Sequence, residues 1–169
     1  VNLYDNMPSD NKKPVYTPFR DFIPRYSTAS VIVVQGIKDK ESPDLTTMWT
    51  ILGSPLTSVT VPVWLNKGKI YPSTLTAVKE ENADLCDWSL SVKKKLFPIS
   101  VGEGIDYINL AALITSDQKG ILQKIQPLEN LILENGDILL ENWRKGKKSD
   151  VELKNFCNEV DKLLTDFYQ

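Results

Sequence analysis

The chain has 169 residues, of which 41% are hydrophobic and 25% charged, and its net charge at pH 7 is −2. This length and composition are typical of one globular domain and exclude a disordered or fibrous chain. The charge argues against a nucleic-acid-binding protein, and no apolar run approaches the roughly 18 residues that a membrane span needs. Because the chain contains no histidine, it can hold no His-based catalytic triad and no His-containing metal site.

The first 18 residues have the composition of a loop or linker. They contain three prolines together with several Asn, Asp and Ser residues, which break regular structure. The chain also begins with Val1 rather than methionine. We therefore expect that it has been separated from a preceding segment by processing or trimming.

Residues 19–78 read as the strand-rich part. The β-branched run at 29–37 predicts a strand buried on at least one face, and 46–54 is compatible with a short helix or a strand. Residues 56–65 alternate, which predicts a strand whose core face carries Val59, Val61, Val63 and Leu65. Pro62 favours an edge position for this strand, because proline cannot donate to a ladder. A turn at 66–69 and a short return strand after it complete the prediction.

Residues 79–169 read as a helical region that packs on the sheet. Leu85, Trp88, Val92 and Leu96 are spaced as one apolar face of an amphipathic helix, and a loop follows at 97–104. Residues 106–115 and 117–143 are predicted as helices, with Pro127 and Gly136 as candidate kinks. A capping-box pattern at 149–152 predicts a last helix, which we expect to form an antiparallel hairpin with the preceding one.

The order of the elements, strands first and helices afterwards, predicts the α+β class. Two or three strands make a poor independent sheet, so we expect the chain to be part of a larger fold. On its own, the chain is expected to expose apolar sheet surface and to associate or aggregate. A homo-oligomer is one possible form of this association.

The motifs that commonly carry chemistry are mostly absent from the sequence. It contains no phosphate-binding glycine loop and no GxSxG element. Cys86 and Cys157 are far apart in the sequence, which favours small buried hydrophobic residues over a disulfide or a nucleophile. The basic cluster at 144–148 is interpreted as a solvated loop between helices. We expect no metal and no cofactor.

One family resemblance rests on two short segments. The segment Pro24-Arg25-Tyr26-Ser27, followed by Ile51-Leu52-Gly53-Ser54 with Trp49 nearby, resembles the later half of bacterial N-terminal-nucleophile (Ntn) hydrolases. The likeness is to the acyltransferase-like branch that includes choloylglycine hydrolase, and it covers about residues 19–65. It implies a four-layer αββα sandwich, of which 19–78 would supply part of the sheet.

The resemblance also implies a function. Such enzymes cleave linear amide C–N bonds with an N-terminal Cys thiol, and their own α-amino group serves as base, which needs no histidine. By this match Arg25 is the candidate catalytic residue, since a planar cation can tune a thiolate or hold a carbonyl. Tyr26 and Trp49 are candidate substrate-binding residues, although aromatic side chains beside strands are commonly core residues.

The chain departs from the family at its first residue, because Val1 is not a nucleophile. The expected partners are therefore the missing N-terminal portion of the same protein and a small-molecule amide, with no nucleic acid and no membrane. The resemblance further implies a secreted or periplasmic bacterial enzyme. Two alternatives stay open: a non-catalytic α+β binding or structural module, with Arg25 paired to a carboxylate such as Asp21 or covering a strand end, and an inactive protein that keeps the Ntn fold.

Overall fold

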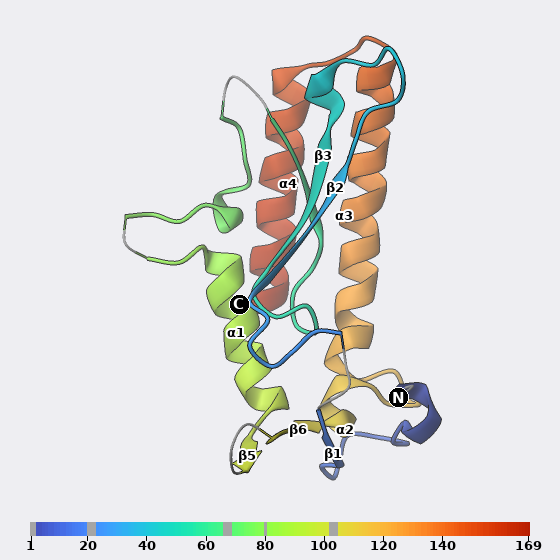
Figure 1. The fold of residues 1–169 in the computed structure, drawn as a ribbon, viewed down its shortest axis with the longest axis vertical. Coiled ribbons are helices and arrows are strands. Elements are labelled where there is room, and N and C mark those ends of the chain that lie inside the picture. The colour runs from blue at the N-terminus through green and yellow to red at the C-terminus, as the bar shows by residue number, and fades with distance from the viewer. Residues whose placement is uncertain (1–2, 20–22, 66–68, 80, 102–104) are drawn as a thin grey trace.

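The computed structural model describes residues 3–19, 23–65, 69–79, 81–101 and 105–169, which form an α+β fold (Figure 1). The α-helices among these residues are α1 (Asp84–Leu96), α2 (Leu110–Leu113), α3 (Ile121–Arg144) and α4 (Asp150–Tyr168). The strands are β1 (Tyr16–Pro18), β2 (Ser30–Gln35), β3 (Thr47–Leu52), β4 (Val61–Trp64), β5 (Ile99–Val101) and β6 (Ile105–Asn109). The predicted α+β class is confirmed.

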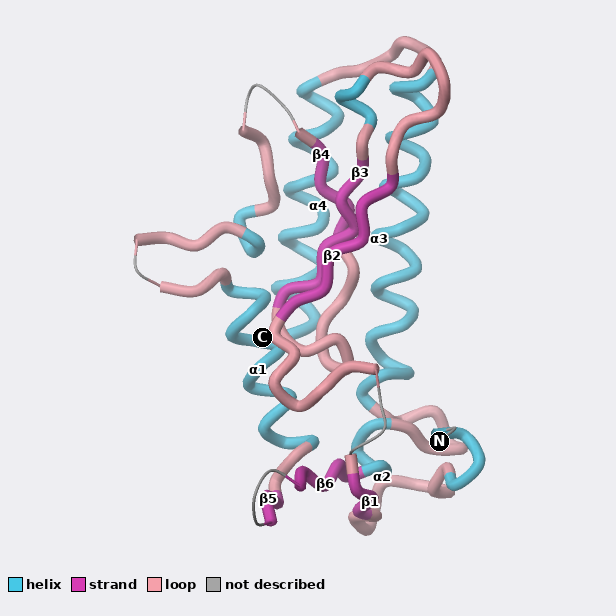
Figure 2. Tube along the Cα trace, viewed as in Figure 1, coloured by secondary structure: helices cyan, strands magenta, loops and turns pink. Residues whose placement is uncertain are grey.

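The strands form two separate antiparallel sheets (Figure 2). The larger has the order β2-β3-β4, and its register sets Val33 opposite Trp49 and Trp49 opposite Pro62. Pro62 thus lies on an edge strand, as predicted. The smaller sheet has the order β1-β6-β5 and lies at the opposite end of the molecule from the α3–α4 turn. Segments 46–54 and 29–37 both contain strands, so the open choice at 46–54 resolves to β3.

The helices α3 and α4 lie side by side as an antiparallel hairpin behind the larger sheet, as expected (Figure 1). The predicted capping box is confirmed in part, because the Glu152 amide donates to Ser149 Oγ at 3.4 Å. Pro127 and Gly136 both lie inside α3 without ending it. Gly136 has a packing reason, since an added Cβ there would come within 2.7 Å of Pro62 Cγ on β4.

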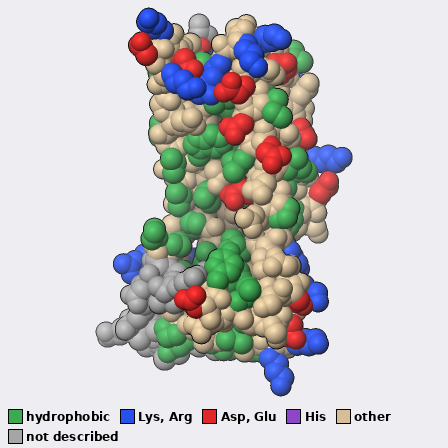
Figure 3. Space-filling view, turned by 90° about the vertical axis from the view of Figure 1, so that its right-hand side faces the viewer, with side chains coloured by type: hydrophobic (Ala, Val, Ile, Leu, Met, Phe, Trp, Pro, Cys, Tyr) green, Lys and Arg blue, Asp and Glu red, His purple; other side chains and the backbone are tan. Residues whose placement is uncertain are grey.

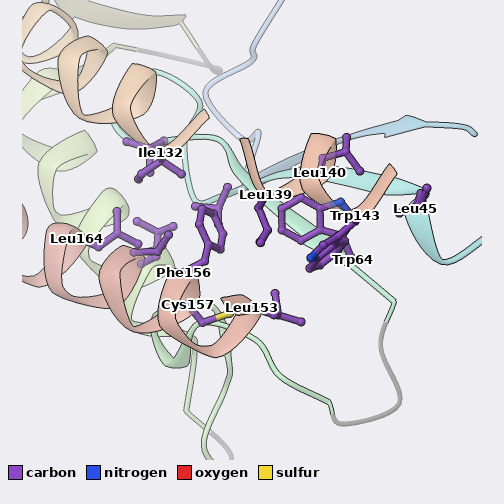
Figure 4. Close-up of a cluster of buried hydrophobic side chains, with 14 of the residues drawn as sticks. Leu45, Trp64, Ile132, Leu139, Leu140, Trp143, Leu153, Phe156, Cys157 and Leu164 are labelled. Carbon is purple, nitrogen blue, oxygen red and sulfur yellow. The ribbon is translucent and has the colours of Figure 1, made fainter. Parts of the chain in front are cut away.

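Two hydrophobic clusters form the core. The larger joins β4 to α1, α3 and α4 (Figure 4), and its bulkiest members are Trp64, Trp143 and Phe156. The smaller joins the β1-β6-β5 end to α2 and to the end of α1. Its buried members are Phe19, Leu96, Phe97, Ile108, Leu110, Leu113 and Ile114. Each cluster combines strand and helix residues from segments far apart in the sequence, so both sheets are packed against helices.

Three predictions in the strand-rich part are wrong. The strand predicted at 56–65 covers only Val61–Trp64, and its faces are not as expected, since Trp64 is 2% exposed and Leu65 is 64% exposed. Burial on both sides of β4 overrides the alternation. The return strand predicted after residue 69 is instead coil and a 3-10 helix (Ser73–Leu75), because the Asp161 carboxylate accepts the Ser73 and Thr74 amides. The turn predicted at 66–69 lies largely outside the described residues.

The third wrong prediction, after the strand at 56–65 and the return strand, is the burial of β2. Ile32, Val33 and Val34 are 54%, 59% and 62% exposed. The strand is an edge of its sheet, and α3 packs against β4, the opposite edge of the same sheet. The expectation that the chain exposes apolar sheet surface is confirmed at this strand.

The helical part contains an unpredicted sheet. The helix predicted at 106–115 is wrong, since Ile105–Asn109 is β6 and only Leu110–Leu113 is helical. The predicted loop at 97–104 contains β5, and the predicted N-terminal loop contains β1, which pairs with β6. Tyr16 lies opposite Asn109 in this pairing. The boundaries at 18 and 79 therefore do not separate a linker, a sheet region and a helical region.

Candidate functional site

The residues of the Arg25 motif form a tight turn just before β2. The Arg25 amide donates to Thr28 Oγ1 at 2.9 Å, and the Thr28 amide donates back to the Arg25 carbonyl at 3.0 Å. These two bonds fix the backbone, while the Arg25 side chain is exposed. The turn thus fixes the backbone of Arg25 directly before β2.

The structure brings the two motif segments together. The Gly53 amide donates to the Ala29 carbonyl at 2.8 Å, which extends the β2–β3 pairing by one residue pair. Gly53 has φ +86°, and an added Cβ would lie 2.5 Å from Ser89 Cβ on α1. Ser89 Oγ in turn accepts the Ser54 amide at 2.9 Å. The Ile-Leu-Gly-Ser segment is therefore the joint at which β3, the Arg25 turn and α1 meet.

Tyr26 is held by α1. Lys93 is only 8% exposed, its Nζ donates to the Tyr26 carbonyl, and the same ammonium lies 4.0 Å from the centroid of the Tyr26 ring. The ring also packs edge-to-face on Phe97, with centroids 5.3 Å apart. Beside it is an open pocket of about 320 Å³, lined by Tyr26, Asp87, Leu90, Ser91, Lys93 and Lys94. Tyr26 is thus a wall of a surface pocket next to Arg25.

Trp49 does not join this group. It lies opposite Val33, in the middle of the strand pair, and its Nε1 donates to Gln35 Oε1 at 2.9 Å. Four residues of extended strand, about 13 Å, separate Trp49 from Gly53. Trp49 therefore lies at another place along the sheet than the Arg25–Tyr26 turn.

Ser89 and Lys93 are the site residues that sequence reasoning missed. They follow Leu85 at four-residue intervals and share its buried stripe on α1. The predicted stripe placed Trp88 and Val92 between Leu85 and Leu96, and both are only half-buried. The sequence did contain a signal, because Ser89 and Lys93 lie on the same helical stripe as Leu85 and Leu96. Buried polar side chains need hydrogen-bond partners, so such a stripe indicates a polar contact with another segment.

The thiols among the described residues are not activated. Cys157 is buried in the main core, and burial, helped by Asp161, raises the pKa of its thiol to about 12. The pKa of the half-buried Cys86 is also raised, by burial and then by Asp87. Since the thiolate is the nucleophile, neither cysteine is suited to attack a carbonyl at neutral pH. Both are free, and Cys157 confirms the prediction of a small buried hydrophobic residue.

The raised pKa of Cys157 predicts a loss of stability at high pH. Between its ordinary value of 9.0 and about 12, the unfolded chain releases the thiol proton and the folded chain keeps it. The free energy of unfolding is therefore expected to be highest below pH 9 and to fall as the pH rises above it. Urea titrations between pH 7.5 and 10.5 measure this slope.

Cys157→Ala is the matched variant for that titration. It is expected to keep a weaker slope, because burial also raises the pKa of Tyr168 and that phenol acts in the same direction. Equal slopes for the variant and the parent chain would contradict the assignment of the effect to Cys157.

The described residues give no sign of a metal centre, and the basic cluster at 144–148 lies among carboxylates. Among them, no group of three or more Cys, Asp or Glu side chains is arranged to hold a metal ion. Arg144 pairs with Glu41 at 3.1 Å and Glu141 at 2.6 Å, and Lys148 pairs with Asp44 at 3.3 Å. Figure 3 shows basic and acidic side chains mixed at that end of the molecule. Two of the four basic residues of the cluster at 144–148 are thus paired with carboxylates.

Comparisons with known proteins return no relative: no family model, curated protein or solved structure matches the chain. In the part of the chain that the structure describes, no helix has the length and apolar character to cross a membrane.

Proposed function

We propose that this chain is the C-terminal portion of an Ntn-type hydrolase or acyltransferase acting on linear amide C–N bonds. The observation that carries the proposal is the hydrogen bond between Gly53 and Ala29, which joins the two motif segments. The turn that contains Arg25, and the pocket lined by Tyr26, lie just before the end of this strand pair. In the full protein the chain would contribute the β2-β3-β4 strands and the α3–α4 hairpin to a four-layer αββα sandwich.

The proposed chemistry divides the active site between two portions of the protein. An upstream N-terminal Cys supplies the thiol, and its α-amino group, with an ordinary pKa near 7.7–8.0, takes the thiol proton. Arg25 stabilises the thiolate or the oxyanion that forms as the thiol attacks the amide carbonyl. The raised pKa values of Cys86 and Cys157 support this division, since they leave the described residues without an activated thiol.

The test uses the full-length protein after it has acquired its N-terminal Cys. Hydrolysis is followed with a panel of acylated amino acids, bile-acid conjugates, penicillins and short peptides. We expect Arg25→Ala to lower kcat/KM by at least about 100-fold, and Arg25→Lys to recover part of the loss because it keeps the charge. Lys95→Ala is the matched control, since Lys95 is an exposed cation on α1 outside the pocket.

Three results would overturn the proposal. One is a folded, processed full-length protein that cleaves none of the panel. Another is an Arg25→Ala variant with unchanged hydrolysis and an unchanged melting temperature. The third is a gene that has no Cys codon at an upstream processing site, because the proposed nucleophile would then not exist.

A second candidate function is a binding module without catalysis. The exposed edge strand β2 favours it, because three consecutive apolar side chains on an open edge are a surface that another strand can pair with. In that case the full-length protein hydrolyses none of the amides in the panel, and the Arg25→Ala variant shows the same lack of hydrolysis as the parent.

A further inference from the structure

The edge strand β2 carries exposed apolar side chains that the candidate site does not use. Ile32, Val33 and Val34 are each more than half exposed. Consecutive residues of a strand point to opposite faces of the sheet, so β2 is more than half exposed on both of its faces. Burial of its side chains therefore does not explain why the strand is so rich in β-branched residues.

The hydrogen-bonding phase of β2 identifies which backbone groups are open. The Gly53 amide donates to the Ala29 carbonyl, so the 29–53 pair is a hydrogen-bonded pair. Such pairs alternate with non-bonded pairs along an antiparallel ladder, and the register continues unbroken from Ser30–Leu52 to Gln35–Thr47. The N–H and C=O groups of Ser30, Ile32 and Val34 therefore point away from β3, toward the open edge.

This edge lacks the devices that keep natural edges from pairing. Residues 29–37, with the sequence ASVIVVQGI, contain no charged residue and no proline. Charges, prolines and bulges are the usual protection of an exposed edge strand. The other edge of the same sheet, β4, carries Pro62 and is covered by α3. The two edges thus differ, and β2 is the one that is free to accept a strand.

We propose that β2 pairs antiparallel with β2 of a second copy of this chain, about a two-fold axis at Ile32. Antiparallel partners must share the hydrogen-bonding phase, so an outward residue has to face another outward residue. With Ile32 opposite its own copy, Ser30 lies opposite Val34 and Val31 opposite Val33. The two three-stranded sheets then join into one continuous sheet.

The charge pattern favours a second copy over a partner that is recognised by its charge. In an isologous pairing each residue meets the same strand in reverse, so any charge within the strand would meet an equally charged strand. The paired residues carry none, and this register sets all three exposed apolar residues at its centre. A partner recognised by charge would find no counter-charge along β2. The proposal concerns the 169-residue chain and is separate from the hydrolase function. In a full-length sandwich, a strand of the missing portion would compete for the same edge.

Sedimentation velocity of the 169-residue chain at micromolar concentrations tests the proposal, and a dimer is expected. Val34→Pro removes an amide that β3 does not use, so the dimer should be lost while the melting temperature stays close to that of the parent chain. Ile32→Lys and Ile32→Glu each set like charges opposite one another across the axis, which should raise the dissociation constant at least about tenfold. Val151→Lys, at an exposed position on α4, is the matched control and should leave the dimer unchanged.

Mixing the two charge variants decides the register. If Ile32 faces its own copy, the Lys and Glu variants together should form a heterodimer that neither forms alone. A monomeric parent chain, a dimer that survives Val34→Pro, or charge variants that stay monomeric when mixed would each overturn the proposal. Open-ended association instead of a closed dimer would do the same.

Discussion

Gly53→Ala is expected to lower the free energy of unfolding by about 2–5 kcal/mol. The residue has φ +86°, which costs an L side chain about 1–2 kcal/mol. The new Cβ would also lie 2.5 Å from both Ser89 Cβ and Ser89 Oγ, and forcing an extra carbon into a packed site costs about 1–3 kcal/mol. The two costs add because one is backbone strain and the other is a steric clash. Urea denaturation followed by circular dichroism measures the sum.

Gly36→Ala is the matched control for this prediction. Gly36 follows β2, has no positive φ, and an added Cβ there meets nothing within 4 Å. Its replacement should leave stability unchanged or raise it by up to about 1 kcal/mol, because alanine restricts the unfolded chain. A Gly53→Ala variant no less stable than Gly36→Ala would contradict the assignment of strain to Gly53.

A double mutant separates the clash from the backbone strain. Ser89→Gly removes both atoms that the new Cβ would meet, and it also removes the hydrogen bond that Ser89 Oγ accepts from the Ser54 amide. The double variant Gly53→Ala/Ser89→Gly is therefore expected to be more stable than the sum of the single effects, by at least about 1 kcal/mol. Strict additivity would mean that backbone strain alone accounts for the loss.

The helices were predictable because their signals are local. The spacing of Leu85 and Leu96, the lysines at the end of α1 and the Ser149 cap all lie within the element they define. The same holds for the α3–α4 hairpin, since two long amphipathic helices joined by a short polar turn pack antiparallel through their apolar faces.

The strand β6 was missed because its partner is distant in sequence. The apolar run at 105–114 is compatible with a helix, and what makes its first half extended is pairing with Tyr16–Pro18, some ninety residues earlier. Propensity is a weak guide where such long-range pairing decides. The same limit applies to β2, whose apolar run indicates a strand correctly but does not say whether anything covers it.

The motif segments of the candidate site could be named from the sequence, but the residues that hold them in place could not. The sequence shows the two motif segments in order, but it left 46–54 open as a helix or a strand and did not predict that they pair, as the Ala29–Gly53 bond shows they do. The position of Trp49 depended on a register that the sequence does not show. Lys93 was missed because a lysine is rarely buried, and its burial depends on the Tyr26 carbonyl and ring, which only the folded chain supplies.

Trp64→Ala is expected to cost about 3–5 kcal/mol of stability, which is typical of removing a large aromatic side chain from a packed core. Trp64 is 2% exposed and joins β4 to both long helices (Figure 4), since its ring packs edge-to-face on Trp143 at 5.0 Å and on Phe156 at 5.8 Å. The loss should appear in urea denaturation as a lower midpoint. Leu65→Ala, the next residue along and 64% exposed, is the matched control and should change stability by no more than about 0.5 kcal/mol.

Trp64→Phe separates the polar part of this contact from the apolar part. Trp64 Nε1 donates to Thr47 Oγ1 at 2.8 Å, and the Thr47 hydroxyl itself donates to the Leu45 carbonyl at 3.2 Å. Phenylalanine keeps an aromatic ring between α3 and α4 but leaves the buried Thr47 oxygen without its donor, so a loss of about 1–3 kcal/mol is expected. Because Thr47 lies on β3 and Trp64 on β4, the same loss should speed hydrogen exchange of the amides that pair these strands. If Trp64→Phe were as stable as the parent chain, the hydrogen bond would contribute nothing and the ring packing alone would hold β4 to the helices.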